Sequence, residues 1–179
     1  MGERIEGEHN LIANLELMEG SNDANLIIGN YNRLQHGVRI FLGAEPQIDW
    51  ISTYVFGVCE PDVFERPELD GCWVRSKGDV VIENDCFIGY GATIMSGVTI
   101  RNGSIIGVNS VVVKSTEPYS IYGGNPAKFI RWRFPEDIRE KLLKTAWWNL
   151  PIEKIREIQP ILLSNNYEKL FEVLNLKND

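Results

Sequence analysis

The residues best suited to chemistry in this chain are basic ones, and they gather in one segment. Between positions 114 and 144 the sequence carries seven basic residues against four acidic ones, although the whole chain has a net charge of −7. The seven are Lys114, Lys128, Arg131, Arg133, Arg139, Lys141 and Lys144. Two interpretations stay open, the solvated surface of an amphipathic helix or a site that gathers basic side chains around a polyanionic small molecule. The acidic balance of the whole chain argues against a general nucleic-acid-binding protein.

Histidines and cysteines are too few and too scattered for a metal centre. The chain has two histidines, His9 and His36, and three cysteines, Cys59, Cys72 and Cys86. Their spacing is not that of metal ligands, so we expect no metal and reduced thiols, as in a cytoplasmic protein. The N-terminus, MGERIEGEHN, is acidic and lacks the apolar region of a signal peptide. No apolar run approaches the roughly 20 residues of a spanning helix, so we expect no membrane insertion.

A six-residue period predicts the element that must position these groups. Large aliphatic residues recur at every sixth position, with mostly small residues two places before each. They are Ile82, Ile88, Ile94, Ile100, Ile106 and Val112, with an upstream run at Ile28, Leu34 and Ile40. A helix would repeat its apolar face every three or four residues, and a half-buried strand every second one. Fixed-period repeats build stacked units, so three hexapeptides would make one triangular coil of an all-β solenoid, the parallel β-helix.

The repeat is interrupted once and then gives way to helical sequence. Residues 44–78 break the six-residue register and carry prolines and aromatics, which predicts a long, ordered, projecting loop. Helices are predicted after the repeats, at about 135–146, 151–163 and 166–176. We therefore expect a β-helix domain over 1–134 and a C-terminal helical segment over 135–179. These helices would cover the open end of the solenoid, where strand edges are unpaired.

Three stretches resemble the hexapeptide acyltransferases, in particular the xenobiotic and polysaccharide branch related to the chloramphenicol acetyltransferases. They are GDVVIENDCFIGYGATIMSGVTIRNGSIIGVNSVVVKSTEPYSIYGGNPAKFIRWRF (78–134), DWISTYVF (49–56) and AWWNLPIEKI (146–155). The resemblance implies a left-handed β-helix, which is an exception to the usual right-handed crossover. It also implies a homotrimer, with acetyl-CoA as co-substrate in the cleft between neighbouring prisms.

The resemblance carries a set of binding residues onto this chain. Those implied for acetyl-CoA are Tyr90 and Gly91 at a coil corner, Val108 and Val113 along the channel, Lys114 on the last coil, and Lys128 and Arg131 near the nucleotide phosphates. Ordinary coil packing is the alternative for the two valines, and a solvated surface is the alternative for the basic residues. In the acceptor loop, Trp50, Tyr54 and Phe56 suggest a pocket with aromatic walls for a small-molecule acceptor. Their alternative role is to hold the loop down.

The expected catalytic base is where this chain departs from the family. A histidine stands just before the D-W-x-x-T-Y segment in the family, and here the position holds Pro46, or Gln47 if the alignment shifts by one, and neither can serve as a base. Three groups remain as candidates: Glu45, Asp49 and His36. Each also has a structural interpretation, the carboxylates as hydrogen-bond acceptors in the loop and the histidine as a surface residue at a coil corner.

Three functions follow from these alternatives. The first is an acetyltransferase acting on an amino sugar or a similar amine, with Asp49 or Glu45 receiving the proton. The second is an O-acetyltransferase acting on a sugar hydroxyl, which needs a base such as His36 or a loop carboxylate. The third is a catalytically impaired trimer that keeps the fold, with or without the binding of CoA. A γ-class carbonic anhydrase is excluded because it needs three histidines for zinc. An acetyltransferase is favoured because the pattern on the CoA side is kept.

Overall fold

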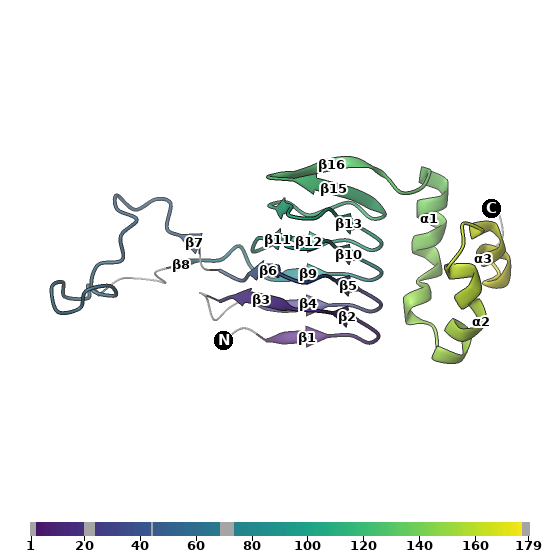
Figure 1. Cartoon of the computed structure of the whole chain (residues 1–179), viewed down its shortest axis with the longest axis horizontal. Coiled ribbons are helices and arrows are strands. Elements are labelled where there is room, and N and C mark those ends of the chain that lie inside the picture. The colour runs from purple at the N-terminus through teal and green to yellow at the C-terminus, as the bar shows by residue number, and fades with distance from the viewer. Residues whose placement is uncertain (1–2, 20–23, 44, 69–73, 177–179) are drawn as a thin grey trace.

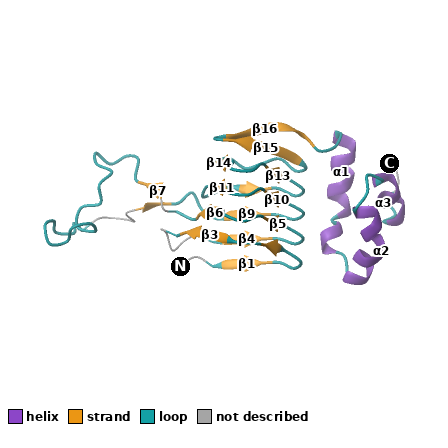
Figure 2. Ribbon diagram, in the orientation of Figure 1, coloured by secondary structure: helices purple, strands orange, loops and turns teal. Residues whose placement is uncertain are grey.

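The chain winds repeatedly through three sheets, whose strands are parallel except for the last strand of the second sheet. The computed structural model describes residues 3–19, 24–43, 45–68 and 74–176. The first sheet holds β1 (Arg4–Glu6), β4 (Leu26–Ile28), β9 (Val80–Ile82) and β12 (Thr99–Ile100). The second holds β2 (Leu11–Ile12), β5 (Arg33–Leu34), β10 (Phe87–Ile88), β13 (Ile105–Ile106), β15 (Ser120–Gly124) and β16 (Ala127–Trp132). The third holds β3 (Leu15–Met18), β6 (Val38–Phe41), β11 (Thr93–Ile94) and β14 (Val111–Val112). The chain passes from first to second to third and back, so that its coils stack (Figures 1 and 2).

The six-residue period is the register of this stack. Phe87 pairs with Ile105 and Thr93 with Val111, and the partners stand three hexapeptides apart in the chain. All nine aliphatic residues of the predicted period are buried, none more than 2% exposed. Burying one such side chain contributes about 1.5–3 kcal/mol, so this interior column is the main source of the stack's stability. The predicted parallel strands and their aliphatic interior are therefore confirmed.

The corner between the first and second sheets, called the first corner below, is tied by asparagines. Its residues with left-handed backbone are His9, Tyr31, Asp85, Gly103 and Tyr119, with φ between 53° and 68°. The backbone N–H of each of the last three donates to an asparagine carbonyl of the coil before, at 2.8–3.1 Å. The Asn84 side chain accepts from the Asn30 N–H at 2.7 Å, and the Asn102 side chain accepts from the Asn84 N–H at 3.0 Å. These bonds satisfy corner groups that the strand ladders leave unpaired.

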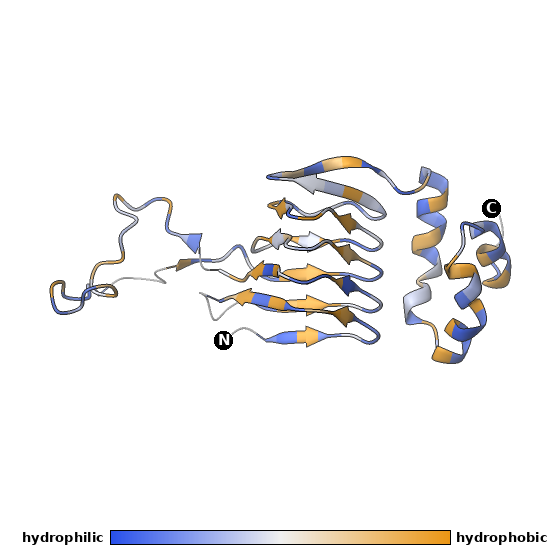
Figure 3. Cartoon of the chain, in the orientation of Figure 1, coloured by the Kyte–Doolittle hydropathy of each residue, from blue (hydrophilic) through white to orange (hydrophobic). Residues whose placement is uncertain are grey.

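The C-terminal helices begin close to where the sequence places them. They are α1 (Glu136–Thr145), the short 3-10 helix η1 (Trp147–Asn149), α2 (Ile152–Leu162) and α3 (Tyr167–Val173). Pro135 and Pro151 stand directly before α1 and α2, and the Asn166 side chain accepts from the Lys169 N–H at 3.0 Å to cap α3. Apolar and polar positions alternate along α1 and α2 (Figure 3), as expected of helices with one buried face.

The expected position of these helices over the open end of the solenoid is wrong. Figure 1 shows α1 running along the side of the stacked coils. The chain leaves β16 through Arg133, whose guanidinium donates to the Gly103 carbonyl at 2.6 Å and lies 3.5 Å from Asp85. The Asn30 amide donates to the Trp148 carbonyl at 3.2 Å. These contacts direct the helices along the first corner, and β15 and β16 form the last strands of the second sheet.

The interrupted part of the repeat leaves the stack on the other side. Strands β7 (Glu45–Pro46) and β8 (Val74–Arg75) pair antiparallel at its foot, and Figure 1 shows residues 47–68, which follow β7, extending away from the coils. Of the three cysteines, Cys59 is an exposed and Cys86 a buried free thiol, while Cys72 lies outside the described residues. Burial raises the pKa of Cys86. Among the described helices, none is long and apolar enough to cross a membrane.

Candidate active site

Three of the residues expected to bind acetyl-CoA, Tyr90, Gly91 and Val108, lie with the candidate base His36 at the corner between the second and third sheets, called the second corner. The Gly91 N–H donates to the His36 carbonyl at 3.0 Å, and the Asn109 N–H donates to the Tyr90 carbonyl at 2.8 Å. His36, Tyr90 and Val108 therefore stack in successive coils. Tyr90 is 60% and Val108 67% exposed. Gly91 completes the corner with φ +67°, and a Cβ there would lie 2.4 Å from the Asn109 side chain.

Val113 and Lys114 lie on the far edge of the third sheet from this corner. They follow β14 directly, and both are exposed. The Met95 N–H donates to the Val112 carbonyl at 3.0 Å. Val113 and Lys114 therefore lie one coil further along the stack than the residues that follow β11. The third sheet thus separates them from the second corner.

Lys128 and Arg131 lie on β16, beyond the last full coil. Both are exposed, opposite Gly123 and Ile121 in the antiparallel ladder with β15. The Arg131 guanidinium donates to the Trp132 carbonyl at 3.3 Å. The two basic side chains therefore stand on one edge strand, where they can reach an anion held beside the stack.

Glu45 is the best-anchored carboxylate at the foot of the loop. Its side chain is 16% exposed, and it accepts a hydrogen bond from the Ser96 hydroxyl at 2.9 Å. The Lys77 ammonium lies 3.8 Å from the other carboxylate oxygen, and the Lys77 N–H donates to the Ser96 hydroxyl at 3.0 Å. A charged donor and a hydroxyl thus orient one carboxylate next to Pro46, the position at which the resemblance leads us to expect a histidine.

A small cavity of about 180 Å³ opens beside this foot. Its lining residues are Pro46, Gln47, Trp50, Ser52, Thr53, Val55 and Val74. Trp50 is therefore in a position to contact a small ligand. Asp49 has a side chain that is 84% exposed and lies 3.8 Å from the Arg75 guanidinium. Solvent screens such an exposed ion pair, so it does little to orient the Asp49 carboxylate.

Tyr54 and Phe56 are not in that cavity. They pack edge to face on each other at 4.9 Å between ring centroids, and Phe64 joins them at 6.2 and 5.0 Å. The Tyr54 hydroxyl donates to the Glu60 carboxylate at 2.5 Å, and this hydrogen bond raises the pKa of Tyr54. These aromatics form a cluster within the loop itself, whereas Trp50 faces the cavity.

Lys77 and Ser96 are site residues that sequence reasoning missed. Each stands directly before a glycine with positive φ, Gly78 and Gly97, and the Gly97 N–H donates to the Gly78 carbonyl at 3.0 Å. The sequence signal that could have identified them is a polar residue directly before a glycine, repeated at the same corner of two neighbouring coils. In the described part of the chain, no group of three or more histidine, cysteine, aspartate or glutamate residues could hold a metal ion.

Comparison with known proteins adds to this geometry. A family model described as bacterial transferase hexapeptide (six repeats) matches residues 79–114. A Lysinibacillus sphaericus protein named "Probable macrolide acetyltransferase" is 45% identical over 147 residues, which is 78% of this chain and 77% of that protein. The Escherichia coli protein named chloramphenicol acetyltransferase is 37% identical over 148 residues, which is 82% of this chain and 70% of that protein.

A solved structure has the same fold. It is the hexapeptide-repeat-containing acetyltransferase of Vibrio cholerae complexed with acetyl coenzyme A, with a TM-score of 0.56 and 24% sequence identity. The match covers 74% of this chain and 61% of that one, so this chain spans less than two thirds of its length.

Proposed function

The chain belongs to the hexapeptide-repeat acetyltransferases, and we propose that it moves an acetyl group from acetyl-CoA to an amine or hydroxyl of a small acceptor. The observation that supports this most is the second corner, where the exposed side chains of Tyr90 and Val108 stack beside Gly91, which carries no Cβ. An extended pantetheine chain needs such an uncluttered edge. Lys128 and Arg131 on β16 would hold the phosphates.

The proposed assembly is a homotrimer of left-handed β-helices with acetyl-CoA between neighbouring prisms. Tyr90, Val108 and Val113 are 60%, 67% and 40% exposed in the single chain, and a neighbouring prism would bury them. Apolar groups exposed on one monomer, here at the two edges of the third sheet, mark an association surface. Light scattering should give a mass of three chains. A mass of one chain at assay concentration, with full activity, would contradict the assembly.

In the proposed reaction the acceptor lone pair attacks the thioester carbonyl, a C–N or C–O bond forms, and the C–S bond breaks to release the thiolate of CoA. The acceptor proton passes to the Glu45 carboxylate, which Ser96 and Lys77 orient. General-base help is typically worth about 10²–10⁴-fold, and a hydroxyl needs it more than a deprotonated amine. Because Pro46 replaces the histidine, an amine of an amino sugar is the proposed preferred acceptor.

The test is the release of the CoA thiol in the presence of amino sugars, the matching neutral sugars, chloramphenicol and a macrolide. We expect turnover, fastest on amines, with a rate that falls as the amine is protonated at lower pH. If acetyl-CoA binds and no acceptor is turned over, the catalytically impaired alternative holds. Faster turnover of hydroxyls than of amines would contradict the proposed preference for an amine acceptor. The proposed acetyltransferase activity would still stand.

The basic residues on β16 give a separate prediction. The double variant Lys128→Ala/Arg131→Ala should raise the KM for acetyl-CoA about tenfold with little change in kcat, because it removes charge-assisted bonds to the phosphates. Steady-state kinetics measures this. Lys154→Ala/Arg156→Ala on α2 removes the same charges elsewhere and should leave the KM unchanged. An equal KM in both double variants would exclude β16 from nucleotide binding.

A further inference from the structure

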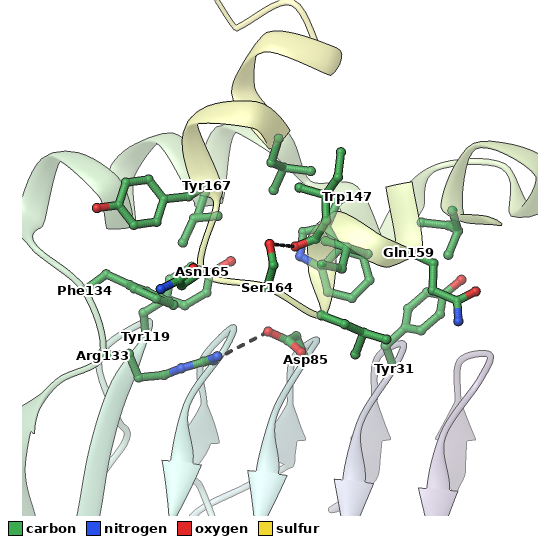
Figure 4. Close-up of a pocket in the computed structure, with 16 residues that line it drawn as sticks. Tyr31, Asp85, Tyr119, Arg133, Phe134, Trp147, Gln159, Ser164, Asn165 and Tyr167 are labelled. Carbon is green, nitrogen blue, oxygen red and sulfur yellow. Dashed lines mark hydrogen bonds and ion pairs between the residues drawn. The ribbon is translucent and has the colours of Figure 1, made fainter. Parts of the chain in front are cut away.

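A larger cavity lies between the first corner and the C-terminal helices (Figure 4). Its volume is about 440 Å³, in the range of small-molecule sites. One side is built from Tyr31, Asp85 and Tyr119, which come from different coils of the stack. The other side is built from the helices and the α2–α3 turn, and its apolar members are Leu142, Trp147, Ile155, Ile161, Leu162, Leu163 and Leu170. The walls are thus mostly apolar, with aromatic rings at both sides.

One polar group of this cavity has no use within the described chain. Tyr119 is 2% exposed, and its hydroxyl is buried without a hydrogen-bond partner among the described residues. Gly103 lies against its ring, and Phe134 meets the ring at 5.8 Å between centroids. An unpaired buried hydroxyl is costly, and native structures rarely retain one without a partner. The Tyr119 hydroxyl, held rigidly at the cavity wall, can therefore donate a hydrogen bond to an acceptor atom of a ligand.

The charged groups beside it are already matched. The Arg133 guanidinium donates to the Gly103 carbonyl at 2.6 Å, lies 3.5 Å from Asp85, and stacks on Phe134 at 5.1 Å. Carboxylate and guanidinium cancel, so the cavity has no net charge to attract an ion. The rim carries neutral groups, among them Ser164 and Asn165 (Figure 4). A neutral ligand suits these surroundings, because an ion would lose its hydration without a counter-charge.

We propose that this cavity binds a neutral aromatic molecule in which one oxygen accepts a hydrogen bond from the Tyr119 hydroxyl. Two linked aromatic rings would fill the cavity and pack against its apolar walls. The oxygen would accept the hydrogen bond that the buried Tyr119 hydroxyl can donate. The site is distinct from that of acetyl transfer, since the residues expected for acetyl-CoA lie at the second corner, beyond β14 and on β16. It does not depend on the proposed reaction.

The experiment compares two probes that differ by one oxygen, benzophenone and diphenylmethane. For the full chain, calorimetric titration should show that benzophenone binds about tenfold more tightly, because only its carbonyl can accept from Tyr119. Tyr119→Phe should abolish this difference and leave the affinity for diphenylmethane unchanged. Tyr122→Phe, which removes a hydroxyl from β15 outside the cavity, should keep it. An undiminished preference in Tyr119→Phe, or no saturable binding to the full chain, would overturn the proposal.

Photochemistry then tests the place of binding. Benzophenone inserts into nearby C–H bonds under near-ultraviolet light, and peptide mass spectrometry locates the adduct. We expect the label on the apolar residues of 161–167 or on Tyr31, and we expect excess diphenylmethane to suppress it. Labels confined to the projecting loop or to β16 would place the probe elsewhere and reject this site.

Discussion

Glu45→Gln is expected to lower kcat about 100-fold or more, the loss typical of removing a general base. The amide cannot take the acceptor proton, although it still accepts the hydrogen bond that Ser96 donates at 2.9 Å. Folding and the KM for acetyl-CoA should therefore change little. Release of the CoA thiol over a range of acetyl-CoA concentrations measures both constants, and circular dichroism checks the fold.

The neighbouring candidates supply the controls for Glu45. Asp49→Asn removes a carboxylate that is 84% exposed, and His36→Ala removes an exposed ring at the second corner. Each should change kcat by less than about threefold, because removal of an unused surface group has little effect on a barrier. If His36→Ala loses turnover and Glu45→Gln keeps it, the base is His36 and the proposed role of Glu45 is wrong.

The interior of the β-helix could be predicted because one physical rule governs every coil. Each hexapeptide forms one side of a triangular coil and places one large side chain in the interior. Ile82, Ile88 and Ile94 therefore reveal the sheet register before any coordinates are known. The helices could be predicted for another local reason, the prolines at 135 and 151 that start them.

The location of the helices and the two cavities could not be predicted in this way. A period of six says nothing about the direction in which the chain leaves its last coil, which here depends on Arg133 reaching Gly103 and Asp85. The first-corner cavity gathers Tyr31 and Tyr119, which are separated by the projecting loop and several coils. Glu45 meets Ser96 across the same interruption. Such contacts arise from stacking, and the local sequence marks them only weakly, by a polar residue before a corner glycine as at Ser96.

Gly103→Ala is expected to destabilise the protein by about 2–5 kcal/mol, the sum of two separate costs. The residue has φ +68°, where a Cβ costs about 1–2 kcal/mol. A Cβ would also lie 2.4 Å from two ring atoms of Tyr119, and overpacking of this kind costs about 1–3 kcal/mol. The Tyr119 ring cannot swing away, because it is 2% exposed and packed on Phe134. Urea unfolding measures the change in free energy.

Gly37→Ala separates the two costs, because this glycine has nearly the same backbone, φ +71°, and its nearest neighbour would be the Gly91 Cα at 3.8 Å. It should lose only the conformational part, about 1–2 kcal/mol. In a Tyr119→Leu background, Gly103→Ala should likewise cost only that part, because the ring is gone, and the double-mutant cycle would yield the packing energy directly. Equal losses for Gly103→Ala with and without the ring would mean that Tyr119 does not rest on Gly103. The first corner would then lack the rigid support that holds the Tyr119 hydroxyl at the cavity wall.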